Sequence, residues 1–227
     1  MDHRNGRERG FTFIELVFTI AIILTLIGIF APLAMDKLAQ SKTARAQADI
    51  DAIAAALTNF FSDLGHFPAC NANTGGDCDP QSNSVNDLRF LAVCTGSGSC
   101  EPEYPTFTGG GATWDLTTNQ QGGADAPVNN AYNHLVANNP NINATEGESG
   151  LDYRTTKWKG PYITKLAVDP FGKAYIIHVG AMQKTGTAIA SGKGWILSAG
   201  PDGNLDTAPT DTTLQNDDIG YIFCTNC

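Results

Sequence analysis

The side chains best suited to chemistry lie near the C-terminal end of the sequence, in the acidic stretch 198–220. It reads SAGPDGNLDTAPTDTTLQNDDIG. Asp202 and Asp206 are spaced like oxygen ligands in the first half of a calcium loop, and Asp217 and Asp218 could supply further carboxylates. The stretch lacks the turn glycine and the bidentate glutamate of an EF-hand. We predict a structural calcium site here, with a solvated loop of Asx turns as the alternative.

A second chemical group, Glu15, lies at the start of a long apolar run. From Leu16 to Met35 there are 20 residues without a charge, enough for a helix of about 30 Å, the thickness of the hydrocarbon core of a bilayer. Arg4, Arg7 and Arg9 precede this run and would hold the N-terminal end in the cytoplasm. We therefore predict a single-pass membrane protein whose domain after the helix lies on the far side of the membrane from the cytoplasm; the family resemblance described next implies that this membrane is the inner membrane and that the domain lies in the periplasm.

The order of residues around Glu15 is unlike that of an ordinary signal peptide, since no small-residue cleavage site follows the apolar run. A charged leader, then GFTFIE from Gly10 and a long apolar helix, resembles the signal of type IV pilins and type II secretion pseudopilins. That resemblance implies cleavage by a prepilin peptidase between Gly10 and Phe11 and methylation of the new N-terminus. The alternative is a plain membrane anchor with an acid at its edge.

Composition agrees with an exported protein. The whole chain has a formal net charge of −9, and this acidity argues against a nucleic-acid partner. All six cysteines follow the apolar run, and an even number there favours disulfides in an oxidising compartment. Fifteen pairings are possible, of which the local ones need the least rearrangement of the chain. In that case the pairs are Cys70 with Cys78, Cys94 with Cys100, and Cys224 with Cys227.

The apolar run continues into an amphipathic helix over Asp36–Leu64. Its apolar residues recur at helical spacing, at Ile50, Ile53, Leu57, Phe60 and Leu64. Pro32 should kink or loosen the helix near its exit from the membrane, and the pilin resemblance implies that the helix can unwind there in a filament. Gly65 is a natural C-cap.

Residues 69–156 are rich in Gly, Asn, Thr, Ser and Pro. A stretch of this composition is poorly suited to carrying its own core, and we interpret it as a loop-rich, disulfide-containing surface insertion. Short helices are predicted at Ser84–Val93 and Asn129–Val136, where apolar residues are spaced closely enough.

Strand patterns return in the C-terminal part, at Ala174–Val179, Gly194–Ser198 and Gly220–Phe223. The segment WKGPYITKLAVDPFG, which begins at Trp158, resembles motifs of major pseudopilins, and the acidic stretch resembles their calcium loop. We predict an α+β fold, in which a long N-terminal helix packs on a small antiparallel sheet. Its parts are a leader (1–10), a transmembrane and assembly segment (11–35), an amphipathic helix (36–68), the insertion (69–156) and a β-sheet domain (157–227).

The resemblance implies a structural subunit of a periplasmic pseudopilus that drives type II secretion, and a surface pilin for adhesion or motility is the alternative. Its partners would be copies of itself, the prepilin peptidase, an inner-membrane assembly platform, minor pilin-like subunits and, before assembly, the membrane. Phe11, Glu15 and Pro32 would serve assembly, with Glu15 pairing to the Phe11 ammonium of a neighbouring subunit.

The sequence shows no recognisable catalytic arrangement. The sequence has no G-x-S-x-G elbow, no P-loop and no H-E-x-x-H, and His66, His134 and His178 stand singly. We expect no catalytic activity, and a membrane-anchored enzyme is the alternative from another functional class.

Overall fold

The structure, a computed structural model, describes most of the long helix and several separate parts of the remaining chain. The described residues are 10–65, 67–68, 90–97, 100, 103–108, 129–139, 153, 157–179, 193–209 and 211–225. The chain divides into two compact units, Met1–Lys42 and Thr43–Cys227, each of which is described by itself.

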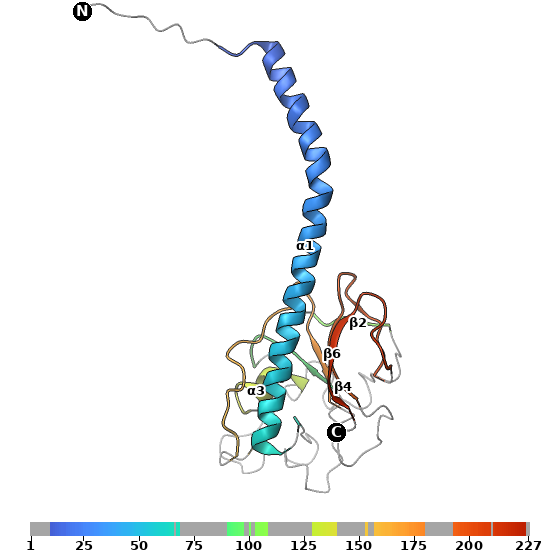
Figure 1. Cartoon of the computed structure of the whole chain (residues 1–227). Coiled ribbons are helices and arrows are strands. Elements are labelled where there is room, and N and C mark those ends of the chain that lie inside the picture. Colours follow the sequence, from blue (N-terminus) through green and yellow to red (C-terminus); the bar gives the residue numbers. More distant parts are fainter. Residues whose placement is uncertain are drawn as a thin grey trace, which may run out of the picture. The chain divides into compact units, whose positions relative to one another are not determined.

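Helix α1 spans Phe13–Leu64 (Figure 1). The helix is continuous through Pro32, so the predicted loosening does not interrupt it, although Pro32 has no N–H to donate to the carbonyl of Gly28. Gly65 follows the last turn with a positive φ of 81°, and its N–H donates to the carbonyl of Phe61 (2.7 Å). The predicted C-cap is therefore confirmed.

The second half of α1 has one buried face. Each of the five apolar residues predicted to form this face is at most 6% exposed. Small side chains at Ala46, Ala54 and Ala56 extend the same face and allow close approach of the sheet. Tyr175 adds a polar link, because its hydroxyl donates to Asp49 Oδ2 on α1 (3.1 Å).

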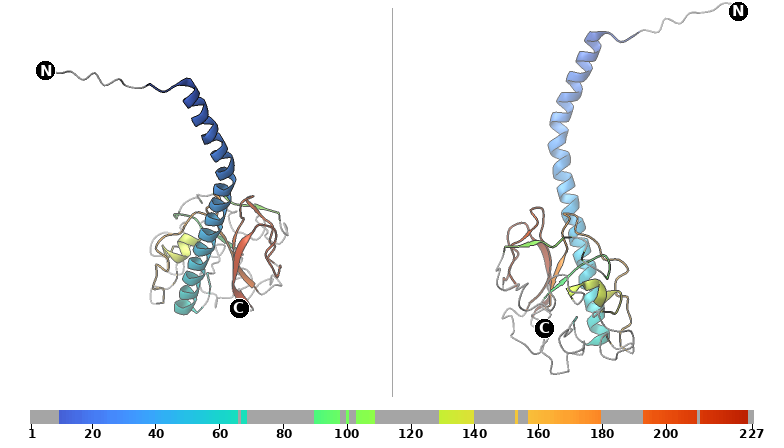
Figure 2. Two further views of the ribbon diagram at one scale, coloured as in Figure 1. Left: turned by 45° about the horizontal axis from the view of Figure 1, so that its top comes forward. Right: turned by 180° about the vertical axis from the view of Figure 1, so that it is seen from behind.

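The described residues form a four-stranded antiparallel sheet with the order β1-β3-β4-β6. Its strands are β1 (Phe90–Ala92), β3 (Ile176–His178), β4 (Lys193–Ser198) and β6 (Ile219–Thr225). The three predicted C-terminal strands are thus confirmed, and so is the α+β class. Figure 2 shows the sheet beside the C-terminal half of α1 from two further directions.

One predicted element is wrong. The stretch Ser84–Val93 was expected to be a helix, but its described part forms strand β1, which pairs with β3 through Leu91 and Ile177. All three residues of β1 are buried. The short apolar run FLAV fits a buried strand as well as a helix, and only pairing with β3 decides between them.

Successive side chains along each strand point to opposite faces of the sheet, and both faces are buried. Leu91, Ile177 and Ile196 face the cluster that includes α1. Their neighbours in the strands belong to a second cluster on the other face, which contains Phe90, Ala92, Ile176, Trp195 and Leu197. Two further short strands, β2 (Thr106–Phe107) and β5 (Asn204–Leu205), pair in parallel, and Phe107 packs against this second cluster.

The predicted helix at Asn129–Val136 is confirmed as α3 (Ala131–Leu135), with Asn130 as its N-cap. The carbonyl of Leu135 accepts from the N–H of Tyr162 (2.9 Å), and Trp158 Nε1 donates to the carbonyl of His134 (3.3 Å). This segment and β1 place buried residues of the 69–156 stretch in the core, where the sequence predicted a surface insertion. The rest of that stretch lies outside the described residues.

Candidate functional site

The N-terminal site consists of the predicted cleavage point and the first turn of α1. Gly10 and Phe11 are both exposed, Phe11 at 89%, which suits a processing site. Thr12 precedes the helix, and its backbone N–H and its hydroxyl both donate to Glu15 Oε2 (2.8 Å each). The N–H of Glu15 donates in turn to Thr12 Oγ1 (3.4 Å). This reciprocal arrangement is a capping box.

The capping box changes the interpretation of Glu15. The sequence predicted a partner on a neighbouring subunit, whereas within this chain Glu15 already accepts two hydrogen bonds from Thr12. Thr12 was not singled out from the sequence, although the spacing T-x-x-E before an apolar run is a readable capping signature. The two roles are compatible, because only one carboxylate oxygen of Glu15 takes part in the cap.

The apolar part of α1 is long and hydrophobic enough to cross a membrane by length and composition. All residues from 10 to 41 are exposed, and large apolar side chains such as Phe13 (82%) and Phe18 (64%) lie open. Exposure of so many apolar groups in one stretch requires a lipid or protein environment. The segment therefore fits membrane anchoring and packing within a filament.

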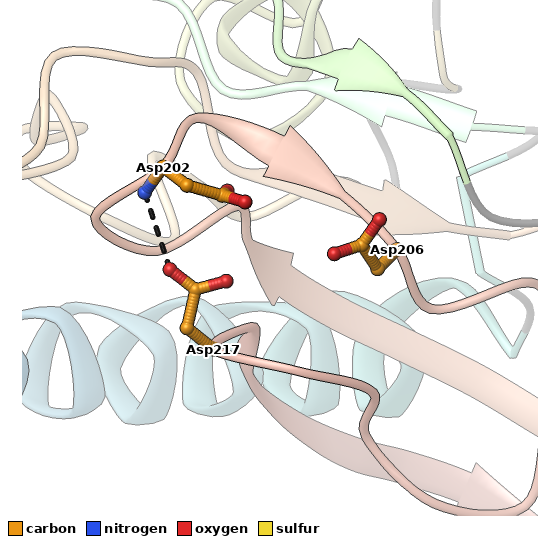
Figure 3. Close-up of side chains that lie close together, drawn as sticks. All are labelled: Asp202, Asp206 and Asp217. Carbon is orange, nitrogen blue, oxygen red and sulfur yellow. Dashed lines mark hydrogen bonds between the residues drawn. The ribbon is translucent and has the colours of Figure 1, made fainter.

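The acidic loop connects β4 to β6 and includes β5. Ligand atoms of Asp202, Asp206 and Asp217 all lie within 4.8 Å of one another, and Figure 3 shows the three carboxylates converging from separate parts of the loop. The backbone N–H of Asp202 donates to Asp217 Oδ2 (3.2 Å). The structure thus brings together three of the four carboxylates predicted from the sequence.

Local hydrogen bonds hold the first carboxylate of this group. Asp202 accepts from both the backbone N–H (2.7 Å) and the side-chain amide (3.0 Å) of Asn204. This is an Asx-type turn, in which the Asp202 carboxylate is fixed by hydrogen bonds from a residue two positions later in the chain. Gly203, between them, has a φ of 73°, which a glycine adopts without strain.

Asp206 is held from both sides, by Thr108 from a distant part of the sequence and by Asn216 from the same loop. The Thr108 hydroxyl donates to Asp206 Oδ1, and Asn216 Nδ2 donates to Asp206 Oδ2 (2.6 Å). These hydrogen bonds, that of Thr108 first, lower the pKa of Asp206 below its ordinary value because they favour the ionised carboxylate. Neither donor was predicted from the sequence.

Asp218, the fourth predicted carboxylate, lies outside the group of three and accepts hydrogen bonds from the loop itself. It is 7% exposed, and its Oδ2 accepts from the backbone N–H groups of Asp206 (3.0 Å) and Thr207 (2.6 Å) and from the Thr207 hydroxyl (2.6 Å). Burial raises its pKa. Its Oδ1 has no hydrogen-bond partner among the residues that the structure describes. Asp218 therefore supports the loop from inside and is not one of the three grouped carboxylates.

The start of the loop requires a glycine at position 200. Gly200 has a φ of 62°, and a Cβ there would lie 2.3 Å from the carbonyl oxygen of Asp217. Its N–H donates to Ser198 Oγ (3.2 Å), and the Ser198 hydroxyl donates to Asp169 Oδ2 (2.6 Å). Burial raises the pKa of Asp169. The two ends of the loop thus touch at Gly200, where only a glycine fits.

The three grouped carboxylates fit a hard divalent cation. Calcium prefers oxygen ligands from carboxylates, carbonyls and water, and the group offers only carboxylate oxygens from Asp202, Asp206 and Asp217. The buried Oδ1 of Asp218, without a hydrogen-bond partner in the described part of the chain, adds negative charge at the base of the loop. Like charges this close repel one another unless a cation or bound protons offset them.

The other candidate residues are only partly described. Cys94 and Cys100 form a disulfide, one of the three local pairings considered from the sequence. Cys70, Cys78, Cys227 and the side chain of Cys224 lie outside the described residues, as does His66.

The two described histidines are buried and have hydrogen-bonding neighbours. His134 Nδ1 lies 2.6 Å from the hydroxyl of Tyr153, and His178 Nδ1 lies 3.3 Å from the carbonyl of Lys193. Both histidine side chains are buried in the unit Thr43–Cys227, here called the globular unit, as is typical of histidines with a structural role.

The chain is similar to known proteins over part of its length. The family profile of the prokaryotic N-terminal methylation motif matches residues 5–31. Fimbrial protein EcpC of Eikenella corrodens is 38% identical over 88 residues, which cover 39% of this chain and 58% of that relative. The chain thus spans little more than half the length of the curated relative it matches. No solved structure matches it.

The methylation motif and the fimbrial relative show that part of the chain is similar to proteins of the type IV pilin superfamily. The long helix followed by a small sheet is consistent with that similarity. Neither comparison specifies the major pseudopilin within that superfamily.

Proposed function

We propose that this chain is a structural subunit that polymerises through its N-terminal helix into a filament. The observation that carries the proposal is the apolar stretch of α1, which is exposed along its whole length and lies largely within the matched methylation motif, residues 5–31. In a monomer the bilayer would cover this stretch. In a filament the helices of neighbouring subunits would cover it, as occurs in proteins of this superfamily.

Maturation is proposed to remove residues 1–10 and to methylate Phe11. Intact-mass analysis of membrane-extracted protein is expected to find a chain that starts at Phe11 with one added methyl group. Gly10→Val should leave the leader attached, because the bulky side chain crowds the scissile peptide, whereas Asn5→Val is the matched control within the leader. Retention of Met1 in the wild-type protein would contradict the proposal.

Two kinds of filament are candidates. The gathered acidic loop and the Trp158–Tyr162 motif favour a periplasmic pseudopilus of type II secretion, while the fimbrial relative favours a surface pilus for adhesion or motility. Deletion of the gene in the source bacterium separates the two. Loss of an exported protein from the medium indicates the pseudopilus, and loss of surface filaments with normal secretion indicates the pilus.

The partners follow from this proposal. The prepilin peptidase would process the leader, an inner-membrane platform and minor pilin-like subunits would start assembly, and further copies of the chain would extend the filament. Before assembly the protein would span the inner membrane with its globular unit in the periplasm, in line with the basic leader.

We further propose that the acidic loop binds a structural calcium ion through Asp202, Asp206 and Asp217. When bound, the ion would offset the repulsion between these carboxylates and hold the two ends of the loop in one conformation. Asp218 would support this geometry through its hydrogen bonds to the backbone of Asp206 and Thr207. A site that forms only in the folded protein also stabilises the fold.

Calcium at about 100 times its dissociation constant should raise the free energy of unfolding by roughly 2.7 kcal/mol. The measurement is a thermal melt of the detergent-solubilised full chain, first in EDTA and then in calcium. Near-ultraviolet circular dichroism monitors the unfolding. Asp202→Asn should lose this gain, and Asp211→Asn, in the same loop but outside the group, should retain it. An equal melting midpoint in EDTA and in calcium for the wild-type protein would overturn the calcium site.

A further inference from the structure

A short segment of the predicted insertion runs alongside the acidic loop. Residues 103–108, here called the strap, contain β2, which pairs in parallel with β5 of the loop. The N–H of Thr106 donates to the carbonyl of Gly203 (3.1 Å), and the N–H of Thr108 donates to the carbonyl of Leu205 (3.0 Å). The backbone of the loop between Gly203 and Leu205 is therefore fixed to the strap.

The strap is itself anchored to the globular unit. The Cys94–Cys100 disulfide joins the chain just before the strap to the end of β1. Lys173 Nζ contacts Glu103 Oε2 at 3.0 Å, and the ring of Phe107 packs near that of Phe90, with centroids 5.9 Å apart. These contacts give the strap a defined position relative to the sheet.

The last strap residue reaches the proposed calcium ligands. Thr108 is 98 residues from Asp206 in the chain, and its hydroxyl donates to Asp206 Oδ1. Asn216 donates to the other oxygen of the same carboxylate (2.6 Å). Without donors on both sides, repulsion from Asp202 and Asp217 would turn the Asp206 side chain away from them.

We propose that Thr108 is a positioning residue, which holds the Asp206 carboxylate toward Asp202 and Asp217 so that the loop is arranged for a divalent cation before the cation arrives. The inference rests on the calcium site proposed above and extends that site to the strap. Residues that orient a ligand through hydrogen bonds commonly change metal affinity by about 10- to 100-fold when they are removed. Thr108 makes such a contact from a segment that has no ligand of its own.

The test is calcium titration by calorimetry on the detergent-solubilised full chain. Thr108→Val keeps the shape and the β-branching of the side chain but removes the hydroxyl, and it should weaken calcium binding roughly 10-fold or more. Thr108→Ser restores the hydroxyl and should restore most of the affinity. Thr106→Val is the matched control, because Thr106 lies two residues earlier in the strap and is exposed, and it should bind calcium like the wild-type protein.

Melting in EDTA separates a positioning role from a purely structural one. We expect Thr108→Val and Thr106→Val to melt at similar temperatures in EDTA, with only Thr108→Val losing part of the gain in calcium. If Thr108→Val binds calcium like the wild-type protein while Asp202→Asn does not, the role of Thr108 is overturned and the site stands. If calorimetry detects no heat of calcium binding to the wild-type protein, the site and the role of Thr108 are both overturned.

Discussion

Glu15→Ala is expected to remain in the membrane but to assemble into filaments poorly, with subunit incorporation reduced roughly 10-fold or more because a charge pair at an interface is lost. In the proposed mature chain Phe11 would carry the new ammonium group, and Glu15 keeps one carboxylate oxygen outside the capping box. That oxygen could pair with the ammonium of a neighbouring subunit as the helix leaves the lipid. The pair would also set the axial register between subunits.

Glu15→Gln separates the charge from the cap. Glutamine at this position can still accept from Thr12, since glutamate and glutamine both serve in capping boxes, but it carries no charge for an ammonium partner. The measurements are membrane fractionation and the yield of sheared or cross-linked filaments. Poor assembly of both variants supports the intermolecular pair. Normal assembly of Glu15→Gln would show that the negative charge is dispensable and that Glu15 serves the cap.

Phe60→Ala should lower the free energy of unfolding of the globular unit by about 3–5 kcal/mol, as large-to-small changes of a buried aromatic residue do. Phe60 is 0% exposed, and its ring lies edge-on to Tyr153 (4.9 Å between centroids) and to Tyr162 (5.4 Å). It therefore joins α1 to two segments that lie far away in the sequence. A loss of this size is a large share of a typical stability of about 5–15 kcal/mol.

The neighbouring residue supplies the control. Phe61 is 43% exposed and has a ring contact with Phe67 (4.7 Å), so Phe61→Ala should cost about 1 kcal/mol or less. Urea unfolding of the detergent-solubilised full chain, followed by near-ultraviolet circular dichroism, measures both changes. Equal losses for the two variants would contradict the placement of Phe60 at the centre of the core.

The sequence alone determined the features that depend on local patterns. The span of the helix, the face buried in its second half, its end at Gly65 and the three C-terminal strands all follow from periodicity or from turn residues close in the chain. The N-terminal signal is equally local, since Gly10, Phe11 and Glu15 are read within a few residues. The capping box of Thr12 and Glu15 could also have been predicted from the sequence, because the two residues are only three positions apart.

Tertiary structure alone decided the features that depend on contacts between distant segments. Phe90–Ala92 is a strand because β3 supplies its hydrogen-bond partners, and no local pattern distinguishes so short an apolar run from a helix. Asp218 turns inward because the backbone N–H groups of Asp206 and Thr207 meet its carboxylate. Spacing in the sequence identified all four acids as candidates, but it could not show that only Asp202, Asp206 and Asp217 lie close together.

The contact between Thr108 and Asp206 is the clearest case. Their side chains are in contact although the two residues are 98 positions apart in the sequence. Nothing in the composition of the predicted insertion indicates that one of its threonines contacts the acidic loop. Pairing of β2 with β5 places them together. A hydrogen bond depends on a separation of about 3 Å in space, and for residues this far apart in the chain only the fold sets that separation.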